Sequence, residues 1–502
     1  MRRARRFRDA LHDPERAQRV TLERIMRLAA GSPYARALGL PVDLAYDAFA
    51  QRVPIVGYED LRPWIDREAR TGVPQLSREP ALLFERTSGS SGLCKLVPYT
   101  RSLLESFNAC FVIWASDVLK NGPRFRTARM FWGMSPALET GRRTAYGTPV
   151  SLADDAGYLA PRYQRLLARL LVAPPGLKCI TDGEAYRRAL AAVLVAEPEL
   201  EIVSVWSPTY LLSILDTIEE RRDEIIADLL LGRTGPRCEI ELPTGAAARA
   251  ALLVEAPISW DRLWPELKLV SCWTDAAAAT FVPALRQALP HTHIEGKGLL
   301  ATEAAMTVPL FDAPAPVPLV DEVFLEFESS DGLVRRLHEL EGGMEYRVIV
   351  SQTGGFLRYR IGDRVHVAGF QDRTPCLRFL GRAGCSSDLA GEKLDEAFAR
   401  AVLEAELGPE GHCSYLMPIT RNGATPGYCC VTDHLTGDFD PEALARRLDE
   451  ALSRSFQYRQ ARHLGQLSQV RVEYRKDARA AYETMQLERG MRWGNIKFTA
   501  LL

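Results

Sequence analysis

Residues 84–98 of the chain read FERTSGSSGLCKLVP. The apolar run 81–84 predicts a buried strand, which gives way to six residues that are only Thr, Ser and Gly. Glycines let the backbone approach a ligand closely, and hydroxyl and successive backbone N–H groups suit anionic oxygens. We therefore predict a polyphosphate-binding loop with a lysine beside it, made of Thr87, Ser88, Gly89, Ser90, Ser91, Gly92 and Lys95.

The spacing of this stretch differs from that of a P-loop, in which lysine directly follows the last glycine and opens a helix. Here Leu93 and Cys94 separate Gly92 from Lys95, and Pro98 excludes an immediate helix because it lacks a backbone donor. The alternative interpretation is a flexible surface turn, since Ser and Gly often cluster in loops.

Composition narrows the class of protein. The chain has 502 residues, a net charge of −1 and 47% hydrophobic residues, which is typical of globular proteins and argues against a broad nucleic-acid interface. The basic start lacks the apolar core of a secretory signal, and no apolar run approaches the length of a membrane span. The ten cysteines form no C-x-x-C pair, and the eight histidines show no metal spacing. We expect a cytoplasmic, monomeric protein with no membrane or nucleic-acid partner.

The middle of the chain predicts an α/β core. Asp13-Pro14 and Thr100 each start a helix. Helices and strands then alternate, which indicates helices layered over a largely parallel sheet. The helices are expected at 184–195, 207–230 and 276–289, and the strands at 201–205 and 267–272.

The pattern changes after Pro309 to the period of two that is typical of strands. The strands are expected at 319–327, 346–350, 356–360 and 365–367, with a turn at Gly354-Gly355. The glycine-bearing run 381–388 predicts a hinge before a small α+β domain, whose first helix is expected at 392–407. We predict a large N-terminal domain at 1–383 and a mobile C-terminal domain at 384–502.

Three further segments carry candidate chemistry. Glu303, in Thr302-Glu303, could hold Mg²⁺, which prefers oxygen ligands. Asp363, in the run that starts at Tyr359, is placed to accept hydrogen bonds from a ribose diol. Lys497 lies in a glycine-flanked loop near the end of the chain. The alternatives are a solvated glutamate, a salt-bridged turn and a surface charge.

Taken in order, the motifs resemble those of the acyl-adenylate-forming superfamily. They are T-S-G-S-S-G-x-x-K-x-x-P at 87–98, T-E at 302–303 and Y-R-x-G-D at 359–363. The flanking sequence is similar to one branch, the auxin-responsive-promoter family of acyl acid amido synthetases. This similarity covers V-P-I at 53–55, V-W-S-P at 205–208, W-P-E-L at 264–267, G-E-K-x-x-E at 391–396 and G-N-I-K at 494–497.

The resemblance implies a mechanism with ATP and Mg²⁺. A carboxylic acid attacks the α-phosphate of ATP, pyrophosphate leaves, and an amine, typically of an amino acid, then attacks the acyl-AMP to form an amide. By position, residues 87–92 and Lys95 would hold the β- and γ-phosphates, Thr302 the α-phosphate and Glu303 the Mg²⁺. Asp363, in the motif that begins at Tyr359, and Arg382 would lie at the ribose. Lys497 would enter from the small domain and stabilise the charge that develops during adenylation.

The chain departs from the superfamily at Leu299, where an aromatic residue usually stacks on adenine, and at Phe498-Thr499, where a proline usually follows the lysine. Trp206, Tyr210 and Phe131 are candidates to line an apolar acyl pocket. Two alternative functions stay open: a ligase that forms an acyl-CoA or carrier thioester, and a catalytically silent nucleotide- or acid-binding module.

Overall fold

The computed structural model describes residues 2–87, 95–133, 142–151, 155–180, 182–235, 239–255, 257–382, 386–387, 389–390, 392, 394–408, 413–419, 425–434, 440–463, 466–489, 491 and 493–502. The chain forms two compact units. The first contains residues 1–275 and 284–380, and the second contains residues 276–283 and 381–502. From the sequence we predict the boundary between the large and the small domain after residue 383.

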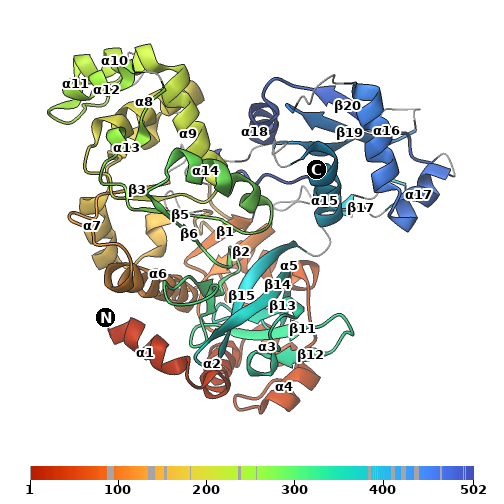
Figure 1. Ribbon diagram of the computed structural model, residues 1–502. Helices are drawn as coiled ribbons and strands as arrows, with labels where there is room; N and C mark the ends of the chain where they lie inside the picture. Colours follow the sequence, from red (N-terminus) through yellow and green to blue (C-terminus); the bar gives the residue numbers. More distant parts are fainter. Residues whose placement is uncertain are drawn as a thin grey trace. The chain divides into compact units, whose positions relative to one another are not determined.

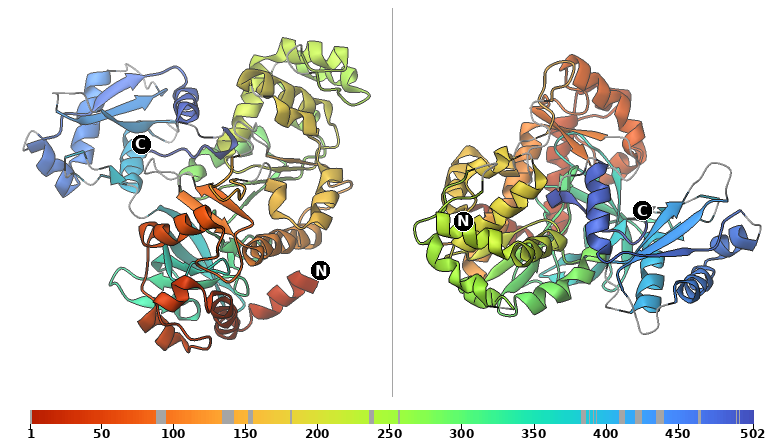
Figure 2. Two further views of the ribbon diagram at one scale, coloured as in Figure 1. Left: turned by 180° about the vertical axis from the view of Figure 1, so that it is seen from behind. Right: turned by 90° about the horizontal axis from the view of Figure 1, so that it is seen from above.

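A four-stranded parallel sheet lies at the centre of the first unit (Figure 1). Its strands are β3 (Met130–Trp132), β4 (Ile202–Ser204), β5 (Leu269–Cys272) and β6 (His293–Gly296), in that order. Helices α6 (Arg101–Asn121) and α7 (Pro161–Leu170) cover one face, and α8 (Gly183–Ala196) and α9 (Pro208–Glu220) cover the other (Figures 1 and 2). The predicted α/β class is therefore confirmed.

Helix α6 begins where the sequence predicts. The Thr100 side chain accepts a hydrogen bond from the Leu103 N–H at 3.3 Å and so caps the first turn. Its buried Val118 and the partly buried Phe111 and Trp114 belong to one hydrophobic cluster with Met130, Ile202 and Leu269 of the sheet. The helix is also long and apolar enough to cross a membrane, with 44% of its most apolar window buried, although no such run was expected from the sequence. A core helix meets the same criteria, so this is weak evidence for a membrane span.

A two-stranded hairpin precedes α6. Strands β1 (Leu83–Thr87) and β2 (Lys95–Tyr99) pair in antiparallel register, with Thr87 opposite Lys95 and Leu83 opposite Tyr99. Helix α5 (Tyr58–Thr71) packs against β2, and the Tyr58 hydroxyl exchanges two hydrogen bonds with the backbone of Leu96. Helix α5 is not among the helices expected from the sequence.

The β-rich part of the first unit is a five-stranded antiparallel sheet, in the order β12-β11-β13-β14-β15. Strand β13 (Glu345–Ser351) agrees with its prediction, whereas β11 is Phe324–Glu328 and not 319–327. Side chains of α2 (Pro14–Ala29) bind the backbone just before β11 in place of a partner strand: Gln18 and Thr21 both donate to the Val320 carbonyl. The outer strands are β12 (Val334–Arg336) and β15 (Thr374–Arg382).

Strand β14 runs unbroken from Tyr359 to Gln371, so the two strands expected at 356–360 and 365–367 are one. Gly362 lies within it at a φ of 88°, which glycine adopts without strain. The register against β13 shifts between Arg347 and Ile349, and this bulge accommodates the irregular backbone. Asp363 therefore projects from a strand and not from a hairpin turn.

Two long predicted helices are each interrupted. The helix expected at 207–230 is divided into α9 and α10 (Arg222–Leu231), because Arg221 leaves the helical conformation at φ −105° and ψ 28°. The helix expected at 276–289 consists of a 3₁₀ segment, Ala276–Phe281, followed by α14 (Val282–Ala288). Pro283 cannot donate the bond that would continue one α-helix through this point.

The second unit is an α+β fold around the three-stranded sheet β18-β19-β20. Helices α15, α16 and α17 share one hydrophobic cluster with Leu416 and Tyr428, while α18 packs on Tyr415 through Tyr482. Helix α15 begins at Glu396 and not at Glu392, because Asp395 caps it. The bounds are β18 Tyr415–Ile419, β19 Gly427–Thr432, β20 Arg471–Tyr474, α15 Glu396–Leu407, α16 Pro441–Leu452, α17 Phe456–His463 and α18 Ala478–Glu488.

A buried ion pair fixes the start of β14. The Arg358 guanidinium contacts the Glu326 carboxylate at 2.9 Å, and the two side chains are 7% and 1% exposed. Arg358 also donates to the carbonyls of Ala50 and Val53, and Tyr46 donates to Glu326 at 2.9 Å. Every charge in this network therefore has a partner, as a buried charge requires.

We expect Glu326→Gln to lower the free energy of unfolding by about 3–5 kcal/mol, since it leaves the Arg358 charge buried without its counter-ion. Urea denaturation followed by circular dichroism measures this. Arg360→Ala, on β14, is the matched control, because the ion pair of Arg360 with Glu328 is more open to solvent. The two side chains are 47% and 14% exposed. A change of at most about 1 kcal/mol is expected there. If both substitutions lowered the free energy of unfolding equally, the special role of the buried Arg358–Glu326 pair would be contradicted.

Candidate active site

The Thr302-Glu303 motif forms a tight turn between two short strands, β7 (Leu300–Ala301) and β8 (Ala304–Ala305). The fully buried Tyr99, at the end of the β1–β2 hairpin, donates its hydroxyl to the Thr302 carbonyl at 2.6 Å. Glu303 is 5% exposed. The residue that directly follows the first sequence motif is therefore joined to the second motif, about two hundred residues away, by a direct hydrogen bond.

The third motif meets the second at Glu303. The hydroxyl of Tyr359 lies 3.5 Å from a carboxylate oxygen of Glu303, and both side chains are buried. Asp363, four residues further along β14, is 6% exposed. The carboxylates of Glu303 and Asp363 are thus both buried on neighbouring elements of the first unit. A buried carboxylate destabilises the fold unless hydrogen bonds or opposite charges compensate it.

A second carboxylate, that of Glu85, also acts on Tyr99. Burial raises the pKa of Tyr99 well above its ordinary value, and the charges of Glu85 and Glu303 raise it further. Glu85 is 7% exposed and lies opposite Val97 in the hairpin. By strand alternation Glu85, Lys95 and Tyr99 lie on one face of the hairpin. The sequence analysis did not single out Glu85 or Tyr99.

The proposed phosphate loop is described only at its two ends. Residues 88–92, to which phosphate binding is assigned, lie outside the described residues, as does the side chain of Thr87. Lys95 opens β2, and its Nζ lies 5.4 Å from the ring centroid of Tyr58, within the range of a cation–π contact.

Arg382, assigned to the ribose, and Lys497, near the end of the chain, both belong to the second unit. Arg382 is the exposed last residue of β15, and the side chain of Lys497 is also exposed. The backbone carbonyl of Lys497 accepts a hydrogen bond from Tyr482 at 2.8 Å, which anchors the segment to α18.

The three candidates for the acyl pocket separate. Phe131 is fully buried and Tyr210 is 2% exposed, and their rings pack together on the α9 face of the sheet. Trp206 is half-buried at the carboxyl end of β4, with Lys297 Nζ 5.2 Å from its ring centroid. Only Trp206 therefore lies at the edge where open α/β sheets bind ligands.

Sequence reasoning also missed Lys297, which follows β6 by one residue. Its ammonium donates to Ser204 Oγ at 2.8 Å and to Ser271 Oγ at 3.4 Å. The available signal was its position: a lysine between two glycines, six residues before Glu303. Leu299, between the two, is 5% exposed and belongs to the main hydrophobic cluster.

Glu295, the last but one residue of β6, is buried at the same edge. Burial raises its pKa to about 7, although a hydrogen bond from Trp114 Nε1 at 2.7 Å and the charge of Lys297 both oppose the shift. At neutral pH this carboxyl group is therefore only partly ionised.

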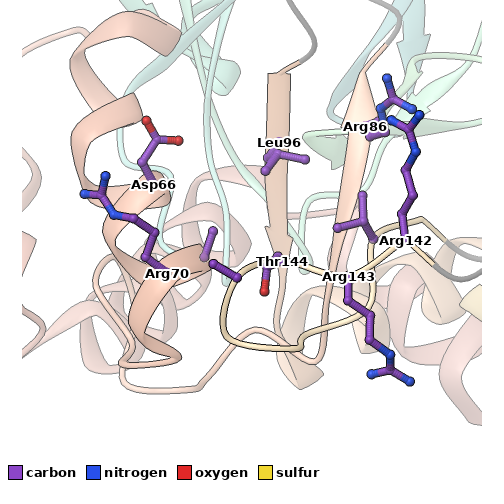
Figure 3. A pocket seen from close by; sticks show the side chains of 10 residues that line it. Asp66, Arg70, Arg86, Leu96, Arg142, Arg143 and Thr144 are labelled. Carbon is purple, nitrogen blue, oxygen red and sulfur yellow. The ribbon is translucent and has the colours of Figure 1, made fainter.

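A separate cavity of about 500 Å³ lies against the outer face of the hairpin (Figure 3). Its floor is apolar, with Leu96 and Val150, and its rim is basic. Leu96 and its partner Arg86 lie on the opposite face of the hairpin from Tyr99. The charged lining residues are Asp66, Arg70, Arg86, Arg142 and Arg143.

Comparison with known proteins identifies the family. The GH3 family N-terminal domain model matches residues 3–294, and the GH3 family central domain model matches residues 317–382. The chain belongs to the GH3 family. The resemblance to acyl acid amido synthetases drawn from the sequence motifs is confirmed.

This GH3 chain has relatives in plants. It is 24% identical to the probable indole-3-acetic acid-amido synthetase GH3.7 of Oryza sativa subsp. japonica, over 93% of this chain and 87% of the relative. It is also 24% identical to jasmonoyl–L-amino acid synthetase GH3.5 of the same organism, over 86% and 82% of the two chains.

Solved structures agree on the fold of this GH3 chain. The AtGH3.15 acyl acid amido synthetase, in complex with 2,4-DB, superposes with a TM-score of 0.82 at 19% identity and covers 99% of this chain and 93% of that one. A 2-hydroxyisobutyryl-CoA ligase in its postadenylation state superposes with a TM-score of 0.52 at 13% identity, over 95% and 91% of the two chains. The fold is therefore that of acyl acid amido synthetases, related to an adenylate-forming ligase.

The raised pKa of Glu295 makes stability depend on pH. The folded protein binds this proton more tightly than the unfolded chain, so ionisation destabilises the fold as the pH rises from about 4.5 to about 7. We expect Glu295→Gln, which keeps an acceptor for Trp114, to stabilise the protein by about 3 kcal/mol at pH 8. The gain should fall to roughly half at pH 5.5. Urea titrations at both pH values measure it, and a gain that does not change with pH would contradict the shift.

Proposed function

We propose that this GH3 chain activates a carboxylic acid with ATP, as acyl-AMP, and transfers the acyl group to an amine, in particular that of an amino acid, to form an amide. The observation that carries the proposal is the convergence at Glu303. The hydrogen bond of Tyr99 joins the β1–β2 hairpin, which flanks the proposed phosphate loop, to Thr302. The hydroxyl of Tyr359 joins strand β14, which carries Asp363, to Glu303. Named relatives that form amides with amino acids support the second step.

The acid must be activated first. Direct attack of an amine on a carboxylate would have to expel oxide, which is not a leaving group at neutral pH. When a carboxylate oxygen attacks the α-phosphorus, the bond to the bridging oxygen of pyrophosphate breaks and a mixed anhydride forms. The amine nitrogen then attacks the acyl carbon, AMP leaves with the former carboxylate oxygen, and the nitrogen loses a proton. In this reaction Thr302 binds the α-phosphate, and Asp363 holds the ribose, to which Tyr359 and Arg382 are also assigned. Lys497 stabilises the charge that develops.

The donor set suits Mg²⁺. No group of three or more His, Cys, Asp or Glu residues able to hold a metal occurs in the described part of the chain. Magnesium needs only one or two carboxylates when substrate phosphates supply the remaining ligands. Glu303 would hold the ion, with Glu85 as the neighbouring carboxylate, and the ion would neutralise phosphate charge.

A carboxylate-dependent assay of pyrophosphate exchange into ATP tests adenylation directly, because it needs no amine. We expect Glu303→Ala to lower exchange by at least about a hundredfold, since a buried group at the phosphates acts mainly on the transition state. The matched control is Glu328→Ala, in the neighbouring sheet and outside the three motifs. Wild-type exchange by Glu303→Ala would contradict the role given to Glu303.

Lys497→Ala is expected to lower exchange by about a hundredfold or more while the circular dichroism spectrum stays unchanged, because the side chain is exposed. Lys476→Ala removes another exposed lysine of the second unit and should leave exchange unaltered. If both variants keep full activity, Lys497 has no part in adenylation. Mass spectrometry of the products formed with amino acids or with CoA then distinguishes an amide synthetase from a thioester ligase.

A further inference from the structure

Tyr58, the first residue of α5, occupies the free edge of strand β2. Its hydroxyl accepts a hydrogen bond from the Leu96 N–H at 2.7 Å and donates one to the Leu96 carbonyl at 3.0 Å. Among the described strands only β1 pairs with β2, so Tyr58 satisfies backbone groups that a second neighbouring strand would otherwise bind. Its side chain is buried, with the residue 6% exposed. Tyr58 therefore holds in place the backbone that directly follows Lys95.

The ring of the same tyrosine contacts the lysine itself. Lys95 Nζ lies 5.4 Å from the ring centroid, within the range of a cation–π contact. Arg62 also lies over this ring, at 5.5 Å, but its charge is paired with Glu59 at 2.9 Å. Lys95 forms no ion pair in the described part of the chain. Because an aromatic ring carries no net charge, it restrains the ammonium without neutralising it.

Tyr58 is itself fixed by the segment that carries the third motif. Two residues before it, the Val56 N–H donates to the Arg358 carbonyl at 3.1 Å, and the Val56 carbonyl accepts from the Arg360 N–H at 2.9 Å. These two arginines flank Tyr359 of the third motif. Segment 56–58 therefore connects the start of β14 to β2 through hydrogen bonds at both ends.

We propose that Tyr58 is a positioning residue for Lys95, and that it holds the ammonium where the β- and γ-phosphates of ATP bind. This inference rests on the proposed function and on the assignment of Lys95 to those phosphates. A lysine side chain has many rotamers, and restraining them beforehand lowers the entropy lost when the ammonium binds a phosphate. Contact through the ring also leaves the N–H donors of the ammonium available to the ligand.

The phosphates of the ligand give this role a specific readout. Isothermal titration calorimetry with Mg²⁺ and without acid measures the Kd for ATP and for AMP, which lacks the β- and γ-phosphates. We expect Tyr58→Leu to raise the Kd for ATP by about five- to tenfold, since the cation–π contact is lost, and to leave the Kd for AMP unchanged. Tyr58→Phe keeps the ring and loses the hydrogen bonds to Leu96, so its effect should be smaller and in the same direction. The Phe variant carries the test by itself if the Leu variant does not fold.

A double-mutant cycle distinguishes positioning from a general effect on the fold. Lys95→Ala alone should raise the Kd for ATP at least as much as Tyr58→Leu does. In the Lys95→Ala background, Tyr58→Leu should change the Kd no further, because the group that it positions is gone. The matched control is Tyr34→Leu. Tyr34 is 5% exposed and packs on Trp64 of α5 at 5.7 Å, and its loss should leave the Kd for ATP as in the wild type.

Failure of this inference can be separated from failure of the proposed function. The positioning role is overturned if Tyr58→Leu keeps the wild-type Kd for ATP, if it raises the Kd for AMP equally, or if its effect persists in the Lys95→Ala background. If ATP binding depends on Tyr58 through Lys95 while no acid supports pyrophosphate exchange, the positioning role stands and the proposed function fails. If acids support exchange while Tyr58→Leu leaves KM for ATP unchanged, the proposed function stands and the positioning role fails.

Discussion

The buried pairing of Arg358 with Glu326 is the constraint on which the site depends. A guanidinium and a carboxylate removed from water stabilise a fold only when their geometry and remaining hydrogen bonds are satisfied. Here the N-terminal helices supply the missing acceptors at Ala50 and Val53. Because Tyr359 is the next residue along the chain, the same network sets where β14 starts and how its side chains face.

Helix α6 connects the two halves of the site. It begins one residue after the hairpin whose Tyr99 binds Thr302, and it extends across the sheet to Trp114 at Glu295. One continuous element therefore connects the β1–β2 hairpin to the carboxyl edge of the parallel sheet.

The sequence was informative where local chemistry decides the structure. Capping by Asp13 and Thr100 gave correct helix starts, and the roles predicted for Glu303 and Asp363 come from their residue types and motifs. The errors arose where tertiary contacts override local pattern. Segment 319–323 alternates like a strand, yet helix α2 binds its backbone.

Two omissions have a physical cause of the same kind. Pro63 disguised helix α5 in the sequence, because proline inside a helix removes one backbone hydrogen bond, and burial of Leu61, Ile65 and Ala69 offsets this cost. A single lysine such as Lys297 carries no periodic signal. Its significance comes from Ser204 and Ser271, which are distant in sequence and become neighbours only when the parallel strands align.

The concentration of tryptophans at the carboxyl edge has a spectroscopic consequence. Half of the eight indoles in the chain lie there, each partly open to its surroundings. Intrinsic emission of the protein is therefore weighted toward this one edge, and its wavelength follows the local polarity. The fluorescence of the unlabelled protein therefore reports on the carboxyl edge of the parallel sheet.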